Sequence, residues 1–151
     1  RSPLENHKSK WNLAFNIIRV ELGMLKKKIL IIEDELRIRK GIGEMFADDF
    51  IVEYAVDGAE GLFKILYNEY DLIITDNHMP HLSGVKMLEI HSEKKINQSY
   101  TPVIMCTTEC DPLFKKRGLK AGVNYWMIKP LNILGFYKLA SKILEEDAVT
   151  F

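Results

Sequence analysis

Short apolar runs recur along the chain from residue 27 onward, separated by stretches of mixed polarity. Five of them have lengths typical of strands: KKILIIE (27–33), IVEYAV (51–56), DLIIT (71–75), PVIMCT (102–107) and VNYWMI (123–128). Three of these runs are continuously apolar rather than alternating, which is typical of strands that a parallel sheet buries on both faces. The pattern therefore predicts five strands, most of them deep in a core.

The spacers between these runs carry apolar residues at helical spacing. A first helix is expected near residues 38–46 and a third over residues 83–96. Asp57 is suited to cap the N-terminus of a second helix. The apolar positions of that second helix are Ala59, Leu62, Phe63 and Leu66.

The last two spacers differ in strength. ECDPLFKKRGLKAG (109–122) is the weakest helix candidate, because Gly118 costs a helix interior about 1 kcal/mol relative to alanine. A fifth helix is expected from about residue 131. Its broad apolar face consists of Ile133, Phe136, Ala140, Ile143 and Leu144.

Strand and helix alternate five times, which predicts a doubly wound parallel α/β sheet with right-handed crossovers. Of the two common strand orders, five strands fit the flavodoxin-like order 2-1-3-4-5. We therefore expect a flavodoxin-like (βα)5 domain over residues 24–151.

Residues 1–23 lie outside this pattern. Trp11, Phe15, Ile18 and Leu22 are spaced four, three and four apart and would form one apolar stripe on a helix. One interpretation is an amphipathic helical extension that docks on a partner or on a second copy of the chain. The other is a linker or upstream sequence, since MLKKKILII is itself a natural beginning for the domain.

Composition narrows the function classes. The formal net charge is zero, so no general field attracts nucleic acid or an anionic membrane. No apolar run approaches the length of a membrane span, and no signal peptide is evident. The two cysteines, Cys106 and Cys110, are separated by three residues and predict neither a redox pair nor a zinc site. We expect a cytoplasmic protein with a buried Cys106 and a Cys110 thiol in a loop.

Polar side chains collect where the predicted strands end. Glu33 and Asp34 follow the first strand, and Asp76 follows the third. Thr107 ends the fourth strand, and Lys129 follows the fifth. Open α/β sheets bind ligands outside the carboxyl ends of their strands, at the point where the strand order reverses. That point lies between the first and third strands, so the three acids should converge there.

Crowded carboxylates raise one another's pKa unless a cation neutralises them. Lys129 supplies one compact positive charge. The remaining negative charge suits a hard divalent cation, and Mg²⁺ fits best because it takes a few carboxylates and shares its other positions with a phosphoryl group. Asp76 could then act as a nucleophile that forms an aspartyl phosphate. The Thr107 hydroxyl could donate to a phosphoryl oxygen.

At these residues the chain resembles the CheY-like receiver domain of a response regulator, from two-component phosphorelay signalling. The resemblance covers about residues 24–146. It rests on four motifs in order on the first, third, fourth and fifth expected strands: ILIIEDE, LIITDNHMPHLSG, PVIMCTT and WMIKP. Each motif alone is weak, and together they are strong.

The resemblance implies a role for each matched residue. Asp76 would accept the phosphoryl group from a phosphohistidine on a sensor histidine kinase or phosphotransfer protein. Asp34 would ligate Mg²⁺ directly and Glu33 through water, with the backbone carbonyl of His78 as a further ligand. Lys129 would bridge to the phosphoryl group. The chain would then be no enzyme beyond its own phosphorylation and dephosphorylation.

The resemblance also implies a switch. Thr107 and Trp126 would report phosphorylation to the surface of the fourth helix, fifth strand and fifth helix, and the Lys129–Pro130 bond would be cis. That surface, or the N-terminal helix, could form a homodimer. The output would be a downstream protein or an output domain outside this chain, with neither nucleic acid nor membrane as a partner of this chain.

Two positions depart from the commonest family pattern. Trp126 stands where a smaller ring is usual, and its indole N–H needs a partner when buried. Thr108 stands where a small residue is usual. Because the indole is larger than the usual ring, we expect inward rotation of Trp126 on phosphorylation, and with it the switch, to be partial.

Two other function classes stay open. One is a pseudo-receiver that binds partners without phosphorylation, although such proteins usually lack an acid that this chain retains. The other is an aspartate-nucleophile phosphohydrolase of the haloacid dehalogenase type. That class needs a second acid two residues after the nucleophile, where this chain has His78.

Overall fold

The computed structural model describes residues 10–11, 13–14, 17–18, 26–94 and 100–146. Five parallel strands form one sheet in the order β2-β1-β3-β4-β5, which confirms the flavodoxin-like order. The strands are β1 (Lys28–Ile32), β2 (Ile51–Ala55), β3 (Leu72–Thr75), β4 (Val103–Thr107) and β5 (Tyr125–Ile128).

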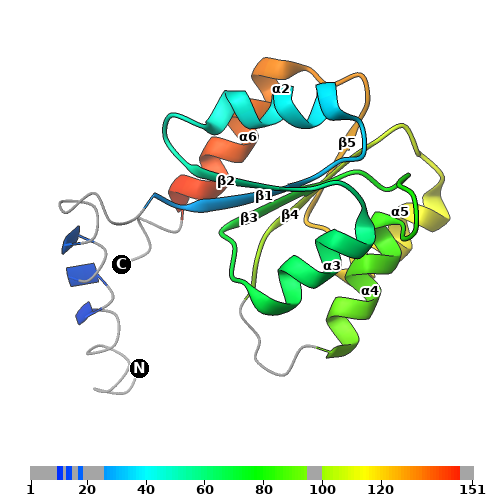
Figure 1. Cartoon of the computed structure of the whole chain (residues 1–151), viewed down its shortest axis with the longest axis horizontal. Helices are drawn as coiled ribbons and strands as arrows, with labels where there is room; N and C mark the ends of the chain where they lie inside the picture. The colour runs from blue at the N-terminus through cyan, green and yellow to red at the C-terminus, as the bar shows by residue number, and fades with distance from the viewer. Residues whose placement is uncertain (1–9, 12, 15–16, 19–25, 95–99, 147–151) are drawn as a thin grey trace.

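Five helices cover the two faces of this sheet. They are α2 (Leu36–Phe46), α3 (Gly58–Tyr67), α4 (Gly84–Lys94), α5 (Pro112–Ala121) and α6 (Ile133–Glu146). Figure 1 shows α2 and α6 on one face, with α3, α4 and α5 on the other. Helices α2, α3, α4 and α5 each connect one parallel strand to the next, as the doubly wound fold requires, and α6 follows the last strand.

The continuous apolar runs are explained by this double cover. In β1, Ile29 and Ile31 pack into the cluster under α2 and α6, whereas Leu30 and Ile32 pack into the cluster under α3 and α4. All four side chains are fully buried. Successive residues of a strand point to opposite faces, so a strand buried on both faces must be apolar at every position.

The weakest predicted helix forms fully as α5. The Asp111 carboxylate accepts a hydrogen bond from the Leu113 amide at 2.8 Å, and Pro112 occupies the first turn. The helix ends at Ala121 and is capped by Gly122, whose φ of 115° suits glycine. Gly118 has a packing role, because a Cβ there would lie 2.5 Å from the Trp126 ring. The glycine that lowered the helix prediction is therefore the contact point for a large side chain.

Three positions of the predicted apolar helix faces are exposed rather than buried: Ala59, Phe63 and Ile133. Phe63 is 64% exposed, because Gly61 and Ile65 occupy the buried side of α3 and a residue midway between them points away. Ile133 is 62% exposed in the first turn of α6, where Phe136 and Ala140 supply the buried contacts. Helical spacing identifies a stripe but does not fix its edges.

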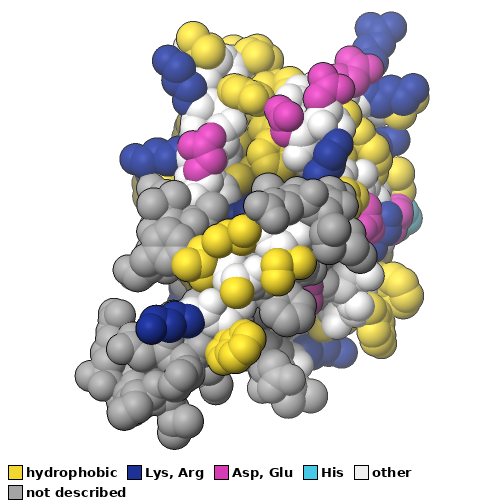
Figure 2. Space-filling view, turned by 90° about the vertical axis from the view of Figure 1, so that its left-hand side faces the viewer, with side chains coloured by type: hydrophobic (Ala, Val, Ile, Leu, Met, Phe, Trp, Pro, Cys, Tyr) yellow, Lys and Arg dark blue, Asp and Glu magenta, His cyan; other side chains and the backbone are white. Residues whose placement is uncertain are grey.

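Six residues of the N-terminal segment are described as helical: Lys10, Trp11, Leu13, Ala14, Ile17 and Ile18. Trp11, Ile17 and Ile18 are exposed, and hydrophobic side chains are visible on the left-hand face of the molecule (Figure 2). Phe15 and Leu22 of the predicted stripe lie outside the described residues, and the division of the chain at residues 23 and 24 stays a prediction.

The two thiols are placed as predicted. Cys106 is buried and Cys110 is exposed, and both are free. Burial raises the pKa of the Cys106 thiol to about 12, so this thiol stays protonated at neutral pH. Within the described part of the chain, no helix is long and apolar enough to cross a membrane.

Candidate functional site

The ladder of the sheet extends one residue beyond three of its strands, and each added residue carries a charged side chain. The Glu33 amide donates to the carbonyl oxygen of the last residue of β2 at 3.1 Å. The Asp76 amide donates to the carbonyl oxygen of the last residue of β1 at 3.1 Å. The Lys129 amide donates to the last residue of β4 at 2.9 Å. Rigid strands therefore position the backbones of all three residues.

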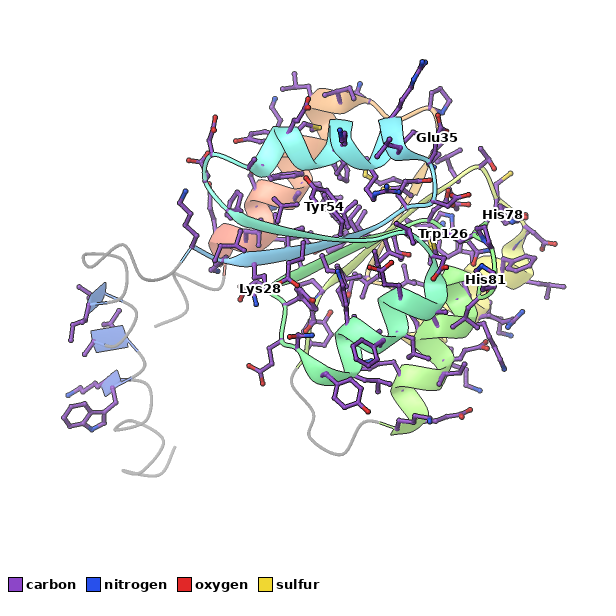
Figure 3. All side chains as sticks on the ribbon, in the orientation of Figure 1. Lys28, Glu35, Tyr54, His78, His81 and Trp126 are labelled. Atoms are coloured by element: carbon purple, nitrogen blue, oxygen red, sulfur yellow. The ribbon has the colours of Figure 1, made fainter. Side chains whose placement is uncertain are left out.

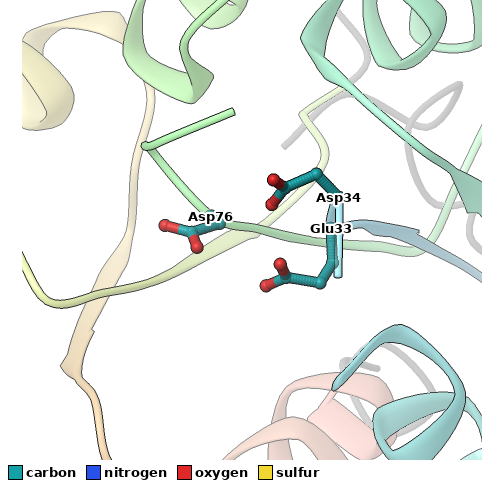
Figure 4. Close-up of side chains that lie close together, drawn as sticks. All are labelled: Glu33, Asp34 and Asp76. Atoms are coloured by element: carbon teal, nitrogen blue, oxygen red, sulfur yellow. The ribbon is translucent and has the colours of Figure 1, made fainter. Parts of the chain in front are cut away.

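The three predicted acids converge at this edge (Figure 4). Glu33, Asp34 and Asp76 each offer a carboxylate oxygen, and these oxygens lie within 4.8 Å of one another. Glu33 and Asp76 are buried, and Asp34 is exposed. Lys129 Nζ lies 2.9 Å from Glu33 Oε2 and 2.8 Å from Asp76 Oδ2, so one ammonium bridges two acids.

Burial and neighbouring charges have opposing effects on the pKa values of Glu33 and Lys129. Burial raises the pKa of Glu33, and the nearby Asp34 carboxyl raises it further against the opposing effect of Lys129. Burial alone would lower the pKa of Lys129, but its hydrogen bonds and charge attraction to Asp76 and Glu33 outweigh burial and raise that pKa. Lys129 therefore stays charged, and three acids facing one lysine leave an excess of negative charge.

The second oxygen of Asp76 is held by the backbone that follows it. Asp76 Oδ1 accepts hydrogen bonds from the amides of Asn77 at 2.6 Å and His78 at 3.2 Å. The Asn77 side chain accepts from the Val85 amide at 3.0 Å, which ties this turn to the start of α4. A Cβ at Gly84 would lie only 2.2 Å from the Asp76 carbonyl oxygen, so the turn requires glycine at that position.

A second group of predicted residues lies at the same end of the sheet. Thr107 is buried, and its hydroxyl oxygen accepts from the Glu109 amide at 3.2 Å. The Trp126 indole N–H donates to the Glu109 carbonyl oxygen at 3.2 Å, which provides the partner that a buried indole needs. His78 Nε2 lies 3.3 Å from Glu109 Oε2. Figure 3 shows His78 and Trp126 at the end of the sheet opposite Lys28.

Substitution of Gly118 by alanine should displace the Trp126 ring. The new Cβ would lie 2.5 Å from the ring, closer than such atoms approach, so the ring must move and its hydrogen bond to Glu109 should weaken. Tryptophan fluorescence should then shift to longer wavelength and become easier to quench.

The measurement needs a Trp11→Phe background, since Trp11 is 68% exposed and would add its own signal. Gly135→Ala is the matched control, because a Cβ at Gly135 meets only Asn132, at 3.4 Å or more. An unchanged Gly118→Ala spectrum would mean that the ring does not depend on this contact.

Most of the predicted site residues are brought together. Glu33, Asp34, Asp76 and Lys129 form one cluster, and the Lys129–Pro130 bond is cis as the resemblance implied. Thr107 and Trp126 are linked through Glu109 rather than to each other. His78 contributes its amide to Asp76, and the role of its carbonyl stays a prediction.

Sequence reasoning missed three residues that shape the site. Asn77, Gly84 and Arg39 each hold the backbone near an acid. Two signals were available: the SG pair at the start of the third predicted helix, and the spacing of four between Glu35 and Arg39. Both are common in proteins without any site, so neither stood out.

The donor set fits Mg²⁺. All three cluster residues are carboxylates, which are the hard oxygen ligands that this ion prefers. The exposed Asp34 leaves the cluster open to solvent on one side, as an ion that keeps several waters would need.

Comparison with known proteins agrees with this geometry. Residues 29–140 match the model of the response regulator receiver domain. The chain belongs to this family, whose members are signalling domains of two-component systems. Over 107 residues it is 38% identical to the response regulator ArlR of Staphylococcus saprophyticus, covering 70% of this chain and 47% of ArlR. The chain thus spans about half the length of the curated relatives that it matches.

Solved structures place the fold in the same family. The receiver domain of Francisella response regulator 1452 is 30% identical with a TM-score of 0.70, covering 80% of this chain and 98% of that one. The chemotaxis protein CheY4 of Vibrio cholerae is 31% identical with a TM-score of 0.67, covering 79% of this chain and 99% of CheY4.

Proposed function

We propose that this chain accepts a phosphoryl group on Asp76, with Mg²⁺ bound at Glu33, Asp34 and Asp76. The observation that carries the proposal is the bridge from Lys129 to two of three converging carboxylates. The excess of negative charge suits a bound divalent cation, and that cation together with the fixed ammonium would neutralise the charge of a phosphoryl group during in-line transfer.

Each side chain has a defined part in the proposed transfer. An Asp76 carboxylate oxygen attacks the phosphorus of a phosphohistidine as the bond from phosphorus to imidazole nitrogen breaks, and that nitrogen keeps the electron pair. The amides of Asn77 and His78 orient the attacking carboxylate. We propose that Lys129 and the Thr107 hydroxyl stabilise the phosphoryl oxygens. When bound, Mg²⁺ would offset the remaining repulsion between the carboxylates and the phosphoryl group, and the His78 carbonyl is a further proposed ligand.

The proposed output is a change at the surface formed by α5, β5 and α6. Thr107 and Trp126 both bond to Glu109, in the segment just before α5, so movement of Thr107 toward a phosphoryl group would affect the position of α5. This surface exposes Leu119, Tyr125, Ile128, Ile133 and Leu134. We propose that a second copy of the chain, a downstream protein or an output domain covers it.

The proposed phosphodonor is a sensor histidine kinase or a histidine phosphotransfer protein in the cytoplasm. A Saccharomyces cerevisiae receiver domain, that of Ssk1, has the same fold with a TM-score of 0.71 at 21% identity, and its structure is a complex with the phosphotransfer protein Ypd1. We propose the same kind of donor for this chain.

Treatment with acetyl phosphate and Mg²⁺ should add the mass of one phosphate to the intact protein. Excess chelator should reduce this addition to background, because the crowded acids would otherwise repel the donor, and renewed Mg²⁺ should restore it. Phosphate addition that is unchanged by the chelator would contradict the proposed metal site. An absence of labelling with Mg²⁺, from acetyl phosphate and from a phosphorylated kinase alike, would favour a pseudo-receiver.

A further inference from the structure

The loop that carries Glu33 and Asp34 is anchored from outside the acidic cluster. Arg39, on the first turns of α2, donates from Nη1 to the Glu33 carbonyl oxygen at 2.8 Å and to the Asp34 carbonyl oxygen at 3.3 Å. One guanidinium nitrogen therefore holds both peptide groups from which these carboxylates extend.

These two carbonyls lie beyond the regular structure on either side. The ladder from β3 to β1 ends at the Ile32 carbonyl, which accepts from the Asp76 amide. Helix α2 begins at Leu36 and receives no side-chain hydrogen bond from its N-cap residue, Glu35. The Glu33 amide is still held by β2, through the Ala55 carbonyl oxygen at 3.1 Å. The orientation of the next two peptides, Glu33–Asp34 and Asp34–Glu35, depends on the Arg39 guanidinium and on the bond from the Glu35 amide to Glu33 Oε1 at 3.1 Å.

We infer that Arg39 is a positioning residue for the divalent-cation site, a role that rests on the proposed function and goes beyond it. Rotation of the Glu33–Asp34 peptide would swing the exposed Asp34 carboxylate away from Glu33 and Asp76. Outer partners that fix the orientation of metal ligands typically contribute about 10–100-fold to metal affinity. Arg39 acts on the backbone of the ligands, where such partners more often act on the side chains.

Charge repulsion between Arg39 and Mg²⁺ predicts the opposite effect of an Arg39 substitution on Mg²⁺ affinity, which makes the inference testable. Arg39 carries a positive charge near a cation site, so removal of that charge should by itself tighten Mg²⁺ binding. Loss of the anchor should weaken it. Arg37 lies two residues earlier on the same helix and is exposed, whereas both hydrogen bonds to the loop come from Arg39. Arg37→Gln therefore removes an equal charge and keeps the anchor.

The experiment is a Mg²⁺ titration by isothermal calorimetry of the full chain and of its Arg39→Gln, Arg39→Lys and Arg37→Gln variants. Thermal unfolding of each protein without Mg²⁺ is measured alongside. Arg39→Gln should bind Mg²⁺ about tenfold more weakly than the wild type. Arg37→Gln should bind equally or slightly more tightly. Arg39→Lys, which keeps the charge and part of the donor capacity, should lie between them. At saturating Mg²⁺, Arg39→Gln should regain wild-type phosphorylation from acetyl phosphate.

Equal Mg²⁺ affinities for Arg39→Gln and Arg37→Gln would overturn the inference while leaving the proposed function intact. If Arg39→Gln does not fold, the comparison passes to Arg39→Lys, and wild-type affinity in that variant would overturn the inference. A wild-type chain that binds no Mg²⁺ would instead remove the proposed function and the role of Arg39 with it.

Discussion

Replacement of Asp76 by asparagine should abolish the phosphate that acetyl phosphate and Mg²⁺ add to the protein. The substitution keeps the shape of the side chain but replaces the carboxylate by a neutral amide, whose oxygen is a poor nucleophile and forms no stable phosphoryl ester. It also removes one of the two acids that Lys129 bridges. Intact mass should therefore stay at the unmodified value under conditions that label the wild type.

Asp49→Asn is the matched control for this result. Asp49 is exposed in the turn after α2 and lies outside the acidic cluster, so the same chemical change there should leave labelling unaltered. In the wild type, the phosphate should be stable in acid and lost in base, as expected for an acyl phosphate. Full labelling of Asp76→Asn would show that another residue is the acceptor.

Replacement of Gly84 by alanine should destabilise the fold and slow phosphorylation together. The new Cβ would lie 2.2 Å from the Asp76 carbonyl oxygen and 3.2 Å from Asn77 Cα. These are backbone atoms, so the turn that orients Asp76 must move. Overpacking of this kind costs about 2–3 kcal/mol in free energy of unfolding. For a domain of this size the melting temperature should fall by roughly 5–10 °C.

Gly41→Ala should have the opposite effect on stability and raise the free energy of unfolding. Gly41 is exposed within α2 and has no atom within 4 Å of an added Cβ, so alanine there should stabilise the helix by about 0.5–1 kcal/mol. Urea denaturation of both variants measures the two effects. Gly84→Ala with wild-type stability and a wild-type labelling rate would mean that the turn adapts without moving Asp76.

The sheet and the acidic edge could be predicted because local sequence and topology determine them. A strand buried on both faces must be apolar at each position, so the runs ending at Ile32 and Thr75 identified central strands. Residues that directly follow parallel strands must meet at one edge, whatever the details of packing. The convergence of Glu33 and Asp76 followed from strand order alone.

Contacts that depend on distant side chains could not be predicted in this way. Gly118 reduced the expected stability of α5, and only the approach of Trp126 explains its presence. Phe63 and Ile133 lie at the edges of apolar stripes, where the orientation of the helix decides exposure. The hydrogen bonds from Arg39 to two carbonyls depend on how α2 lies against the loop, which no local pattern specifies.

The central claim is that three carboxylates and Lys129 make Asp76 a phosphoryl acceptor in the presence of a divalent cation. A crystal structure grown with Mg²⁺ and beryllofluoride tests this most directly. We expect beryllofluoride on an Asp76 oxygen, with Lys129 and Thr107 in contact with its fluorides and Mg²⁺ bound to Asp34. A structure in which beryllofluoride is absent from Asp76, or in which Mg²⁺ binds away from these acids, would contradict the account.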